Sequence, residues 1–394
     1  MRKIINLIIV MFFVAVLPAK LIAQDADQII AKHLAAHGDL KKWEQVEALK
    51  ITARFTAFSE ENDFMCIKTR KGCYYSDLYL GQHKVKEAFD GEKGWTIDPW
   101  MDLPYARKLT DSETNALQQK AEFFTPFFNY KEKGGKVEYK GKETLDGKDV
   151  FVLQLTRKSG KVEKWYLDAK TYLECKCESE WVDFTMPMPC ETFFDDFQDV
   201  DGLKIPFYVE RTFGQRNRIL VIEKVELNPK FDKSMLEMPK REEIEKLAFL
   251  KGNWDVKQEI WTRRGSWYPV TTTTSSIDYT SANLLEENID YNQDFYFEAC
   301  RKINYSYNEH TKKYRLTVFN DLSSNIDVYE GNFNDTCFVA DNSKISYGED
   351  AGKQYTQFVI STIEKDSFII EEKNSQDEGK TWGPVVKFSY TRKK

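Results

Sequence analysis

The chain has 394 residues, and its 63 acidic against 57 basic side chains give a formal net charge of −6 at pH 7. An acidic protein of this kind is a poor partner for nucleic acid or for an anionic membrane surface. The length suggests two domains rather than one, and an aromatic content of 14% favours strand-rich structure.

Residues 1–23 have the pattern of a secretory signal peptide. Arg2 and Lys3 form a basic start, an apolar run extends to Leu17, and small or apolar residues precede Gln24. The run is shorter than the roughly 20 residues that cross a membrane as a helix. Because position 24 is not a lipid-bearing cysteine, we expect a released protein, soluble in the periplasm or secreted. Cleavage removes three basic and no acidic side chains, which changes the net charge from −6 to −9.

A short helix and five strands are predicted after the signal peptide. Asp25 and Gln28 form a capping pair, and Gly38 ends the helix. From about residue 47, apolar and polar residues alternate with the period of half-buried strands. The predicted strands cover residues 49–55, 64–69, 74–80, 84–89 and 95–97.

A second helix is predicted to begin at a capping box formed by Thr110 and Glu113. It runs into four phenylalanines around a proline, which need an apolar surface to cover: Phe123, Phe124, Phe127 and Phe128. Strand alternation then resumes at 150–155, 163–167, 172–178, 190–197, 205–213 and 219–227. Pro229 and Pro239 bracket a charged stretch, so we place the domain boundary near residue 240.

The second half is predicted to be a short amphipathic helix at 241–250 followed by a series of strands. Strands at near-regular spacing with polar turns suggest a small barrel. They cover residues 254–261, 271–279, 284–289, 296–307, 314–320, 326–330, 336–340, 355–363, 367–373 and 385–392.

The seven cysteines leave the disulfide pattern open. Cys300 and Cys337 are candidates for a bridge within the second half. Cys175 and Cys177 share one face of a strand and are too far apart for an easy mutual bridge, so they pack or one pairs with Cys190. A Cys-x-Cys pair with a distant cysteine can bind metal, but no zinc spacing is complete.

The sequence offers no set of residues that converges on catalysis or on a cofactor. His33 and His37 have the i, i+4 spacing of metal ligands, but two ligands do not close a tetrahedral site. We therefore expect a half-exposed helical rim there and no metal. Adjacent carboxylates such as Asp195 and Asp196 point to opposite faces of a strand, and no Gly-x-Ser-x-Gly motif is present. We expect a protein that is not an enzyme, with no catalytic residue and no cofactor.

The first half resembles the bacterial lipoprotein-carrier family of LolA and LolB. The resemblance rests on the order of elements and on short motifs: the Phe89-Asp90-Gly91 hairpin, the Lys164-to-Asp168 strand and the Asp201-to-Pro206 turn. It implies a domain over 24–240 that forms an incomplete antiparallel β-barrel with a helical lid, whose cavity takes acyl chains. The four phenylalanines would then belong to the lid.

The second half resembles a calycin-type domain family of unknown function. Leu250-Lys251-Gly252-Asn253-Trp254 opens its first strand, Asp377 to Trp382 precedes the last strand, and Arg392 closes that strand. The resemblance implies a lipocalin-like closed β-barrel over 241–394. In that pattern the Arg392 guanidinium lies over the Trp254 indole and plugs one end of the barrel.

Together these features predict a mainly β, exported binding protein that sequesters or carries an apolar ligand in the bacterial envelope. The ligand would be a hydrophobic small molecule, a lipid or a lipoprotein acyl chain. Core packing is the competing interpretation of each aromatic residue. The alternative function is a non-catalytic scaffold with filled barrels and an envelope protein as its partner, and cavity volume distinguishes the two. The candidate ligand-binding residues are Trp95, Phe123, Phe124, Phe127, Phe128 and Trp165.

Overall fold

The computed structural model describes residues 26–81, 83–98, 105–183, 186–290, 300–320, 326–346 and 353–394. The chain divides into two compact units. The first contains Lys108–Met238 and the part of the chain before Tyr105, and the second contains Tyr105–Arg107 and Pro239–Lys394. The predicted signal peptide and Asp25 lie outside the described residues. In the described ranges, no helix is long and apolar enough to span a membrane.

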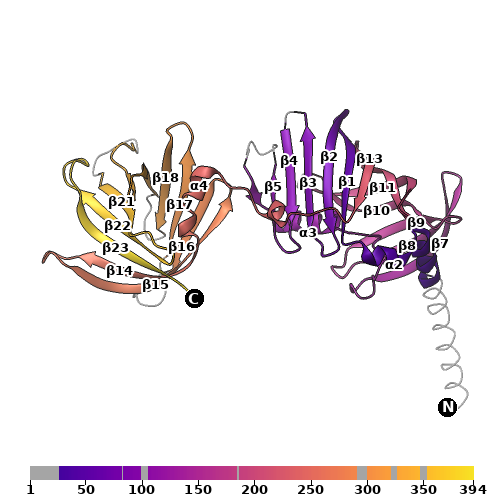
Figure 1. Ribbon diagram of the computed structural model, residues 1–394, viewed down its shortest axis with the longest axis horizontal. Coiled ribbons are helices and arrows are strands. Elements are labelled where there is room, and N and C mark those ends of the chain that lie inside the picture. Colours follow the sequence, from indigo (N-terminus) through magenta and orange to yellow (C-terminus); the bar gives the residue numbers. More distant parts are fainter. Residues whose placement is uncertain are drawn as a thin grey trace, which may run out of the picture. The chain divides into compact units, whose positions relative to one another are not determined.

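One curved antiparallel sheet builds the first unit (Figure 1). Its two edge strands, β5 and β7, are not paired with each other in the part of the chain that the structure describes, so the barrel is incomplete. In pairing order the strands are β5 (Gly94–Ile97), β4 (His83–Phe89), β3 (Tyr74–Leu80), β2 (Glu60–Thr69), β1 (Ala48–Ala57), β13 (Arg216–Leu227), β12 (Leu203–Phe213), β11 (Met186–Val200), β10 (Glu174–Asp183), β9 (Val162–Asp168), β8 (Lys148–Thr156) and β7 (Lys136–Leu145).

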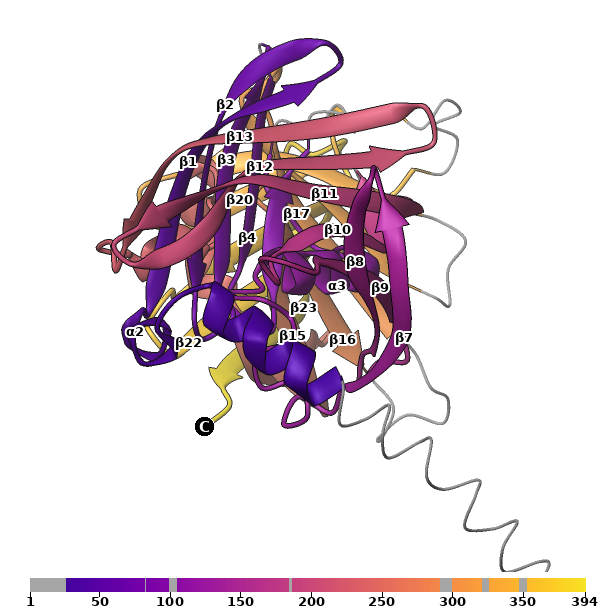
Figure 2. The same ribbon diagram turned by 90° about the vertical axis from the view of Figure 1, so that its right-hand side faces the viewer.

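Helices lie on the open side of this sheet (Figure 2). Residues 26–36 are helical, α2 (Leu40–Gln45) follows, and α3 (Asp111–Lys120) packs against β3, β4 and β10. The predicted capping box of Thr110 and Glu113 is present, with both reciprocal hydrogen bonds. Leu117 of α3 joins Trp43 of α2 in one core cluster.

One prediction for the first unit is corrected, and two elements of it were missed. The helix from Thr110 ends at its cap Ala121, so the four phenylalanines lie in the turns that follow it and not in the helix. Strand β7 was not predicted, although Val137 and Tyr139 alternate with charged residues at its start and pack against a core cluster. None of its side chains is fully buried. The short helix α2 was also not predicted; its side-chain cap is Asp39, one residue after the predicted end of the first helix.

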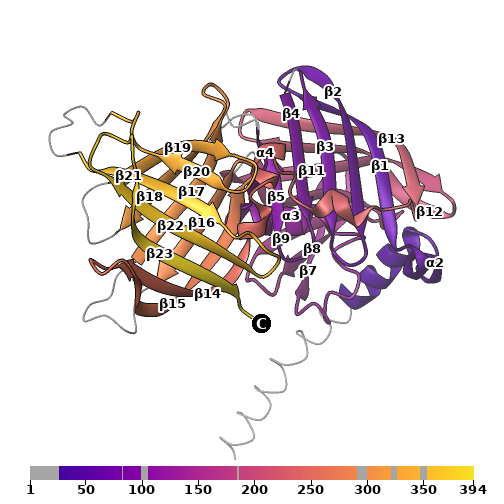
Figure 3. The ribbon, with the colours of Figure 1, turned by 60° about the vertical axis from the view of Figure 1, so that its left-hand side comes forward.

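The second unit is a closed antiparallel β-barrel of ten strands (Figure 3). The last strand pairs with the first, which closes the barrel and leaves no free edge between them. The predicted helix at 241–250 is split into α4 (Glu242–Glu245) and the short 3-10 turn η3 (Ala248–Leu250). The strands are β14 (Gly252–Trp261), β15 (Trp267–Ser281), β16 (Leu284–Asp290), β17 (Cys300–Asn308), β18 (Lys313–Asn320), β19 (Ile326–Phe333), β20 (Phe338–Asp341), β21 (Tyr355–Ser361), β22 (Ser367–Ser375) and β23 (Gly383–Arg392).

Arg392 and Trp254 meet at the seam where the barrel closes. They are directly paired across β14 and β23, and the Arg392 Cζ lies 4.2 Å from the centroid of the fully buried Trp254 ring. The arginine also donates from Nη1 to the Lys251 carbonyl oxygen at 3.0 Å. Gly252 makes room for it, since its φ is +144° and a Cβ there would lie 2.4 Å from Arg392 Nη1. This is the contact that the sequence pattern predicted. The finer likeness to calycins stays a prediction.

All seven cysteines are free thiols. The proposed bridges between Cys300 and Cys337 and between Cys190 and one of its neighbours on β10 are therefore not formed. Cys66, Cys177 and Cys190 are buried and pack as small apolar side chains.

Candidate functional site

The concave side of the first unit holds two adjacent hollows that are partly open to solvent. Their volumes are about 180 Å³ and about 260 Å³, and five residues line both. The first hollow lies against β1–β4 and α3, and the second lies against the turns after α3 and strands β9–β13. The shared residues are Ile51, Lys68, Trp181, Arg211 and Leu220.

Strand alternation decides which side chains face these hollows. On β2, Phe64, Cys66 and Lys68 line the first hollow, because every second residue of a strand points to the same face. On β12, Val209 and Arg211 follow the same rule and line the second hollow. More than half of the described residues that line each hollow are apolar or aromatic, as in most small-molecule sites, and seven in each hollow are charged.

Three of the six candidate ligand-binding residues line the cavity. Phe123, Phe124 and Trp165 all face the second hollow. Phe124 stacks on Trp43 with a centroid distance of 4.2 Å. The segment after α3 therefore forms part of the cavity wall, although it is not helical.

The other three candidates do not line either hollow. Phe127 is 1% exposed and packs in a core cluster with Ile30 and Leu155. Phe128 contacts Phe124 from the side, with ring centroids 5.5 Å apart. Trp95 is buried on β5, where its Nε1 donates to the Leu236 carbonyl oxygen at 2.9 Å.

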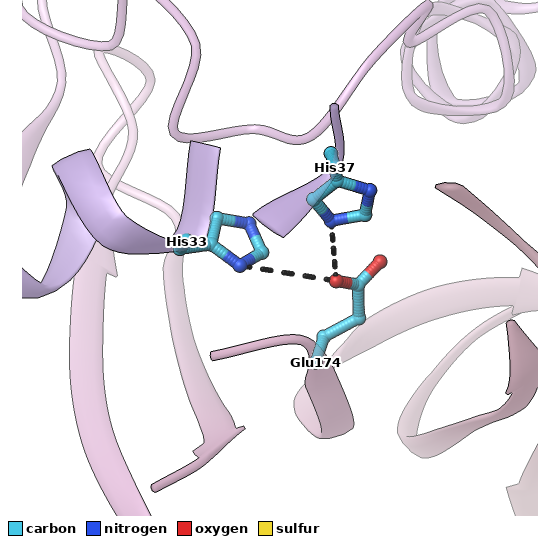
Figure 4. A group of neighbouring side chains, drawn as sticks. All are labelled: His33, His37 and Glu174. Carbon is cyan, nitrogen blue, oxygen red and sulfur yellow. Dashed lines mark hydrogen bonds and ion pairs between the residues drawn. The ribbon is translucent and has the colours of Figure 1, made fainter. Parts of the chain in front are cut away.

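His33 and His37 form a buried cluster with Glu174, next to the second hollow (Figure 4). His37 Nε2 lies 2.8 Å from Glu174 Oε2, and His33 Nδ1 lies 3.9 Å from the same oxygen. His33 and His37 are 0% and 3% exposed. The expectation of a half-exposed helical rim is therefore wrong, because the start of β10 and the turn at Thr125 cover the histidines.

The protein already satisfies every ring nitrogen in this cluster. Nδ1 of His33 donates to the Tyr172 carbonyl oxygen at 2.8 Å, and Nδ1 of His37 donates to that of Lys204 at 2.9 Å. His33 Nε2 pairs with Thr125 Oγ1 at 2.8 Å. A metal ion would have to displace these bonds, so the donor set fits a hydrogen-bonded structural network better than a metal centre.

Burial and the carboxylate act in opposite directions on the two histidines. Burial lowers the pKa of His33 and outweighs the attraction of Glu174. Burial also acts to lower the pKa of His37, but its direct bond to the Glu174 carboxylate outweighs burial, so that this pKa is raised. The pKa of Glu174 is lowered, because His37 outweighs the effect of burial. The stable arrangement is a neutral His33 beside an ion pair of His37 and Glu174.

The C-terminal part of the chain matches one protein-family model. Residues 240–392 match a family described as a protein of unknown function (DUF1579), which is less than half of the chain. No curated protein matches the sequence.

Several solved structures are similar to the chain at low identity. A DUF1329 family protein from Desulfovibrio piger has 12% identity and a TM-score of 0.38, over 54% of this chain and 97% of that one. A LolA superfamily protein from Nitrosomonas europaea has 13% identity and a TM-score of 0.38, with the same coverage. The MucA/MucB complex from Pseudomonas aeruginosa has 9% identity and a TM-score of 0.20, over 93% of both chains. At these TM-scores none of the likenesses carries an argument about function.

Proposed function

We propose that the protein is an exported, non-catalytic binding protein that holds an apolar ligand in the cavity of its first unit. The observation that carries the proposal is the pair of adjacent hollows inside an incomplete barrel. Well-packed protein interiors contain few voids larger than a water molecule. A space of this size with aromatic walls is typical of a ligand site and not of a packing defect.

The walls supply the affinity by removing the ligand's apolar surface from water. Each methylene group that leaves water contributes about 0.8 kcal/mol, before the cost of ordering the ligand. Phe123 and Phe124 support the same function from the segment after α3, where their rings extend the apolar wall beside Trp43. An acyl chain or another linear apolar molecule suits such walls.

The alternative function, a scaffold with filled barrels, is disfavoured for the first unit because its interior has open volume. We propose an envelope location on the strength of the signal-peptide pattern at residues 1–23.

The test is uptake of the neutral apolar fluorophore N-phenyl-1-naphthylamine by the mature protein. Leu220 lines both hollows, so Leu220→Trp places a bulky indole ring where they meet. Val221→Trp is the matched control, because Val221 is the next residue of β13 and is 43% exposed. We expect saturable binding to the wild type and to Val221→Trp, and binding at least about tenfold weaker to Leu220→Trp. Circular dichroism verifies that the variants fold. No binding to the wild type, or unchanged binding to Leu220→Trp, contradicts the proposal.

The natural ligand is identified by native mass spectrometry with organic extraction, on mature protein purified gently from the envelope of its own host. A stoichiometric adduct supports a carrier and gives the mass of its cargo. A bare protein mass together with no probe uptake favours the scaffold.

A further inference from the structure

Two cations lie at the junction of the two hollows. Lys68 reaches the junction from β2 and Arg211 reaches it from β12, and both residues line both hollows. Each stands at an inward position of its strand, among the apolar side chains Phe64, Cys66 and Val209. A cation on the inward face of an apolar cavity is costly unless something compensates its charge.

Neither cation has a carboxylate partner among the residues that the structure describes. The Arg211 guanidinium lies over the Trp181 ring, with Cζ 4.0 Å from the centroid, and its buried Nε has no hydrogen-bond acceptor. Lys68 Nζ donates to the Glu122 carbonyl oxygen at 3.5 Å, which is a long contact for a group with three protons to donate. In the part of the chain that the structure describes, the junction therefore contains one buried donor without a partner, Arg211 Nε, and a lysine held by a long contact.

Six acidic residues of the described ranges line the two hollows, and three of them are paired with other cations. Lys120 Nζ lies 2.7 Å from Glu87, and Arg157 lies 2.7 Å from Glu122 and 2.9 Å from Glu163. These pairs keep the three carboxylates from neutralising Lys68 and Arg211.

The electrostatics of the junction favour an added negative charge. Burial lowers the pKa of Lys68 and the pKa of Arg211, so both cations are held in an environment that disfavours their charged forms. An anion placed between the two cations would accept charge-assisted hydrogen bonds, which replace the bonds to water that the cations lose on burial.

We propose that the ligand of this cavity is an amphiphile with an anionic head group, which Lys68 and Arg211 bind at the junction while its apolar chain extends into a hollow. The inference rests on the proposed function and adds the charge of the ligand to it. A carboxylate and a phosphate ester share the required chemistry, because the planar fork of an arginine binds two oxygens of either group. Trp181 holds the guanidinium flat and so orients that fork.

The test compares four amphiphiles that have the same twelve-carbon chain, each below its micelle-forming concentration. They are dodecanoate, dodecyl phosphate, dodecanol and dodecyltrimethylammonium, and their affinities for the mature protein are measured by displacement of N-phenyl-1-naphthylamine. We expect at least one anion to bind about tenfold or more tightly than dodecanol, and the cation to bind most weakly. The tighter of the two anions distinguishes a carboxylate from a phosphate head group.

Arg211→Gln and Lys68→Gln remove the two charges separately. Each is expected to reduce the preference for the anion over dodecanol by about fivefold or more, with the affinity for dodecanol changed by less than about twofold. Lys224→Gln is the matched control, since Lys224 is an exposed lysine of the same sheet, and it should keep the full preference. If one Gln variant also loses dodecanol binding, its apolar pocket is disrupted. The other Gln variant then tests whether the site prefers an anionic head group.

The two proposals fail in different ways. If dodecanol and the anions bind equally well, or if both Gln variants keep the full preference, the anionic head group is wrong and the apolar site stands. If none of the four amphiphiles displaces the probe and the probe itself does not bind, the proposed function is wrong as well.

Discussion

In the first unit, His37 Nε2 lies 2.8 Å from Glu174 Oε2, and the two residues are 137 positions apart in the sequence. The contact joins the end of the first helical segment to the start of β10, beside the second hollow. His37 also donates from Nδ1 to the Lys204 carbonyl oxygen of β12. One imidazole thus fixes a helix end to two strands of the cavity wall.

Replacement of His37 by glutamine should destabilise the first unit in a pH-dependent way. The pKa of His37 is raised above 6.5, so its pairing stabilises the fold fully below pH 6.5, and this stabilisation is lost as the pH rises through the raised value. The pKa of Glu174 is lowered below 4.5, so its contribution is present above pH 4.5 and is lost on acidification. The pair therefore contributes most between pH 4.5 and 6.5.

Urea denaturation at pH 5.5 and pH 9 measures this effect. We expect His37→Gln to lower the free energy of unfolding by about 3 kcal/mol at pH 5.5 and by clearly less at pH 9. His33, whose pKa is lowered by burial, is present in both the wild type and the variant, so its own pH dependence cancels when their free energies of unfolding are subtracted. The exposed His83 supplies the control His83→Gln, which should change stability by less than about 0.5 kcal/mol. An equal loss at both pH values would show that the charge of His37 has no role.

A buried carboxylate organises the interior of the second unit. Glu287 is 0% exposed, and it accepts hydrogen bonds from Ser275 Oγ at 2.7 Å, Tyr305 OH at 2.7 Å and Tyr390 OH at 2.8 Å. Burial raises the pKa of both tyrosines well above 10, which keeps their hydroxyl groups protonated as donors.

Removal of one of these donors should destabilise the barrel. Tyr390→Phe is expected to cost about 1.5–3 kcal/mol, because it leaves a buried carboxylate with one bond fewer. Tyr268→Phe is the control, since Tyr268 is 62% exposed and should tolerate the change. Thermal unfolding followed by calorimetry gives both values, and equal melting temperatures for the two variants would contradict the role of this network.

Cys66 should be unreactive in the folded protein. It is 3% exposed, and burial raises the pKa of its thiol to about 11, so very little thiolate forms at pH 8. The half-buried Cys337 lies in the turn between β19 and β20 and should react faster than Cys66. Mass spectrometry of peptides after iodoacetamide treatment measures both rates, and the two thiols should react alike in urea. Equal rates in the native protein would place Cys66 in a more open environment than the structure gives it.

The strands were predictable from sequence because most of them have one buried face. Alternation gave all of β1–β5 and β14–β23 at nearly their observed positions. In β7, Val137 and Tyr139 alternate with charged residues only at the start of the strand, no side chain is fully buried, and the strand was missed. The phenylalanines after α3 were predicted to be helical, but their segment is held by turns and by packing on distant residues such as Trp43 and Trp165.

The charged part of the site was harder to predict than its apolar part. Glu174 lies too far from His37 in sequence for any spacing rule to connect them. Lys68 and Arg211 did carry a local signal, since each follows inward apolar residues at intervals of two along its strand. A lysine or arginine at such a position indicates a charge that faces the interior of the sheet. Only the curvature of the sheet in the structure shows that Lys68 and Arg211 lie near each other.

Gly252 should be intolerant of a side chain because of the arginine that lies beside it. Gly252→Ala adds a Cβ at φ +144° and 2.4 Å from Arg392 Nη1, so that the guanidinium must leave the Trp254 ring. We expect a loss of about 2–3 kcal/mol for the second unit, from backbone strain and the lost cation–π contact. Gly265→Ala controls for the strain alone, since Gly265 has φ +75° and its Cβ would meet nothing closer than 4.0 Å.

A double-mutant cycle separates the contact from the strain. In an Arg392→Ala background, Gly252→Ala should cost about 1 kcal/mol less, because the displaced group is already absent. Thermal melts of the wild type, the two single variants and the double variant complete this cycle. A cost of Gly252→Ala that is the same in both backgrounds would mean that strain alone requires the glycine.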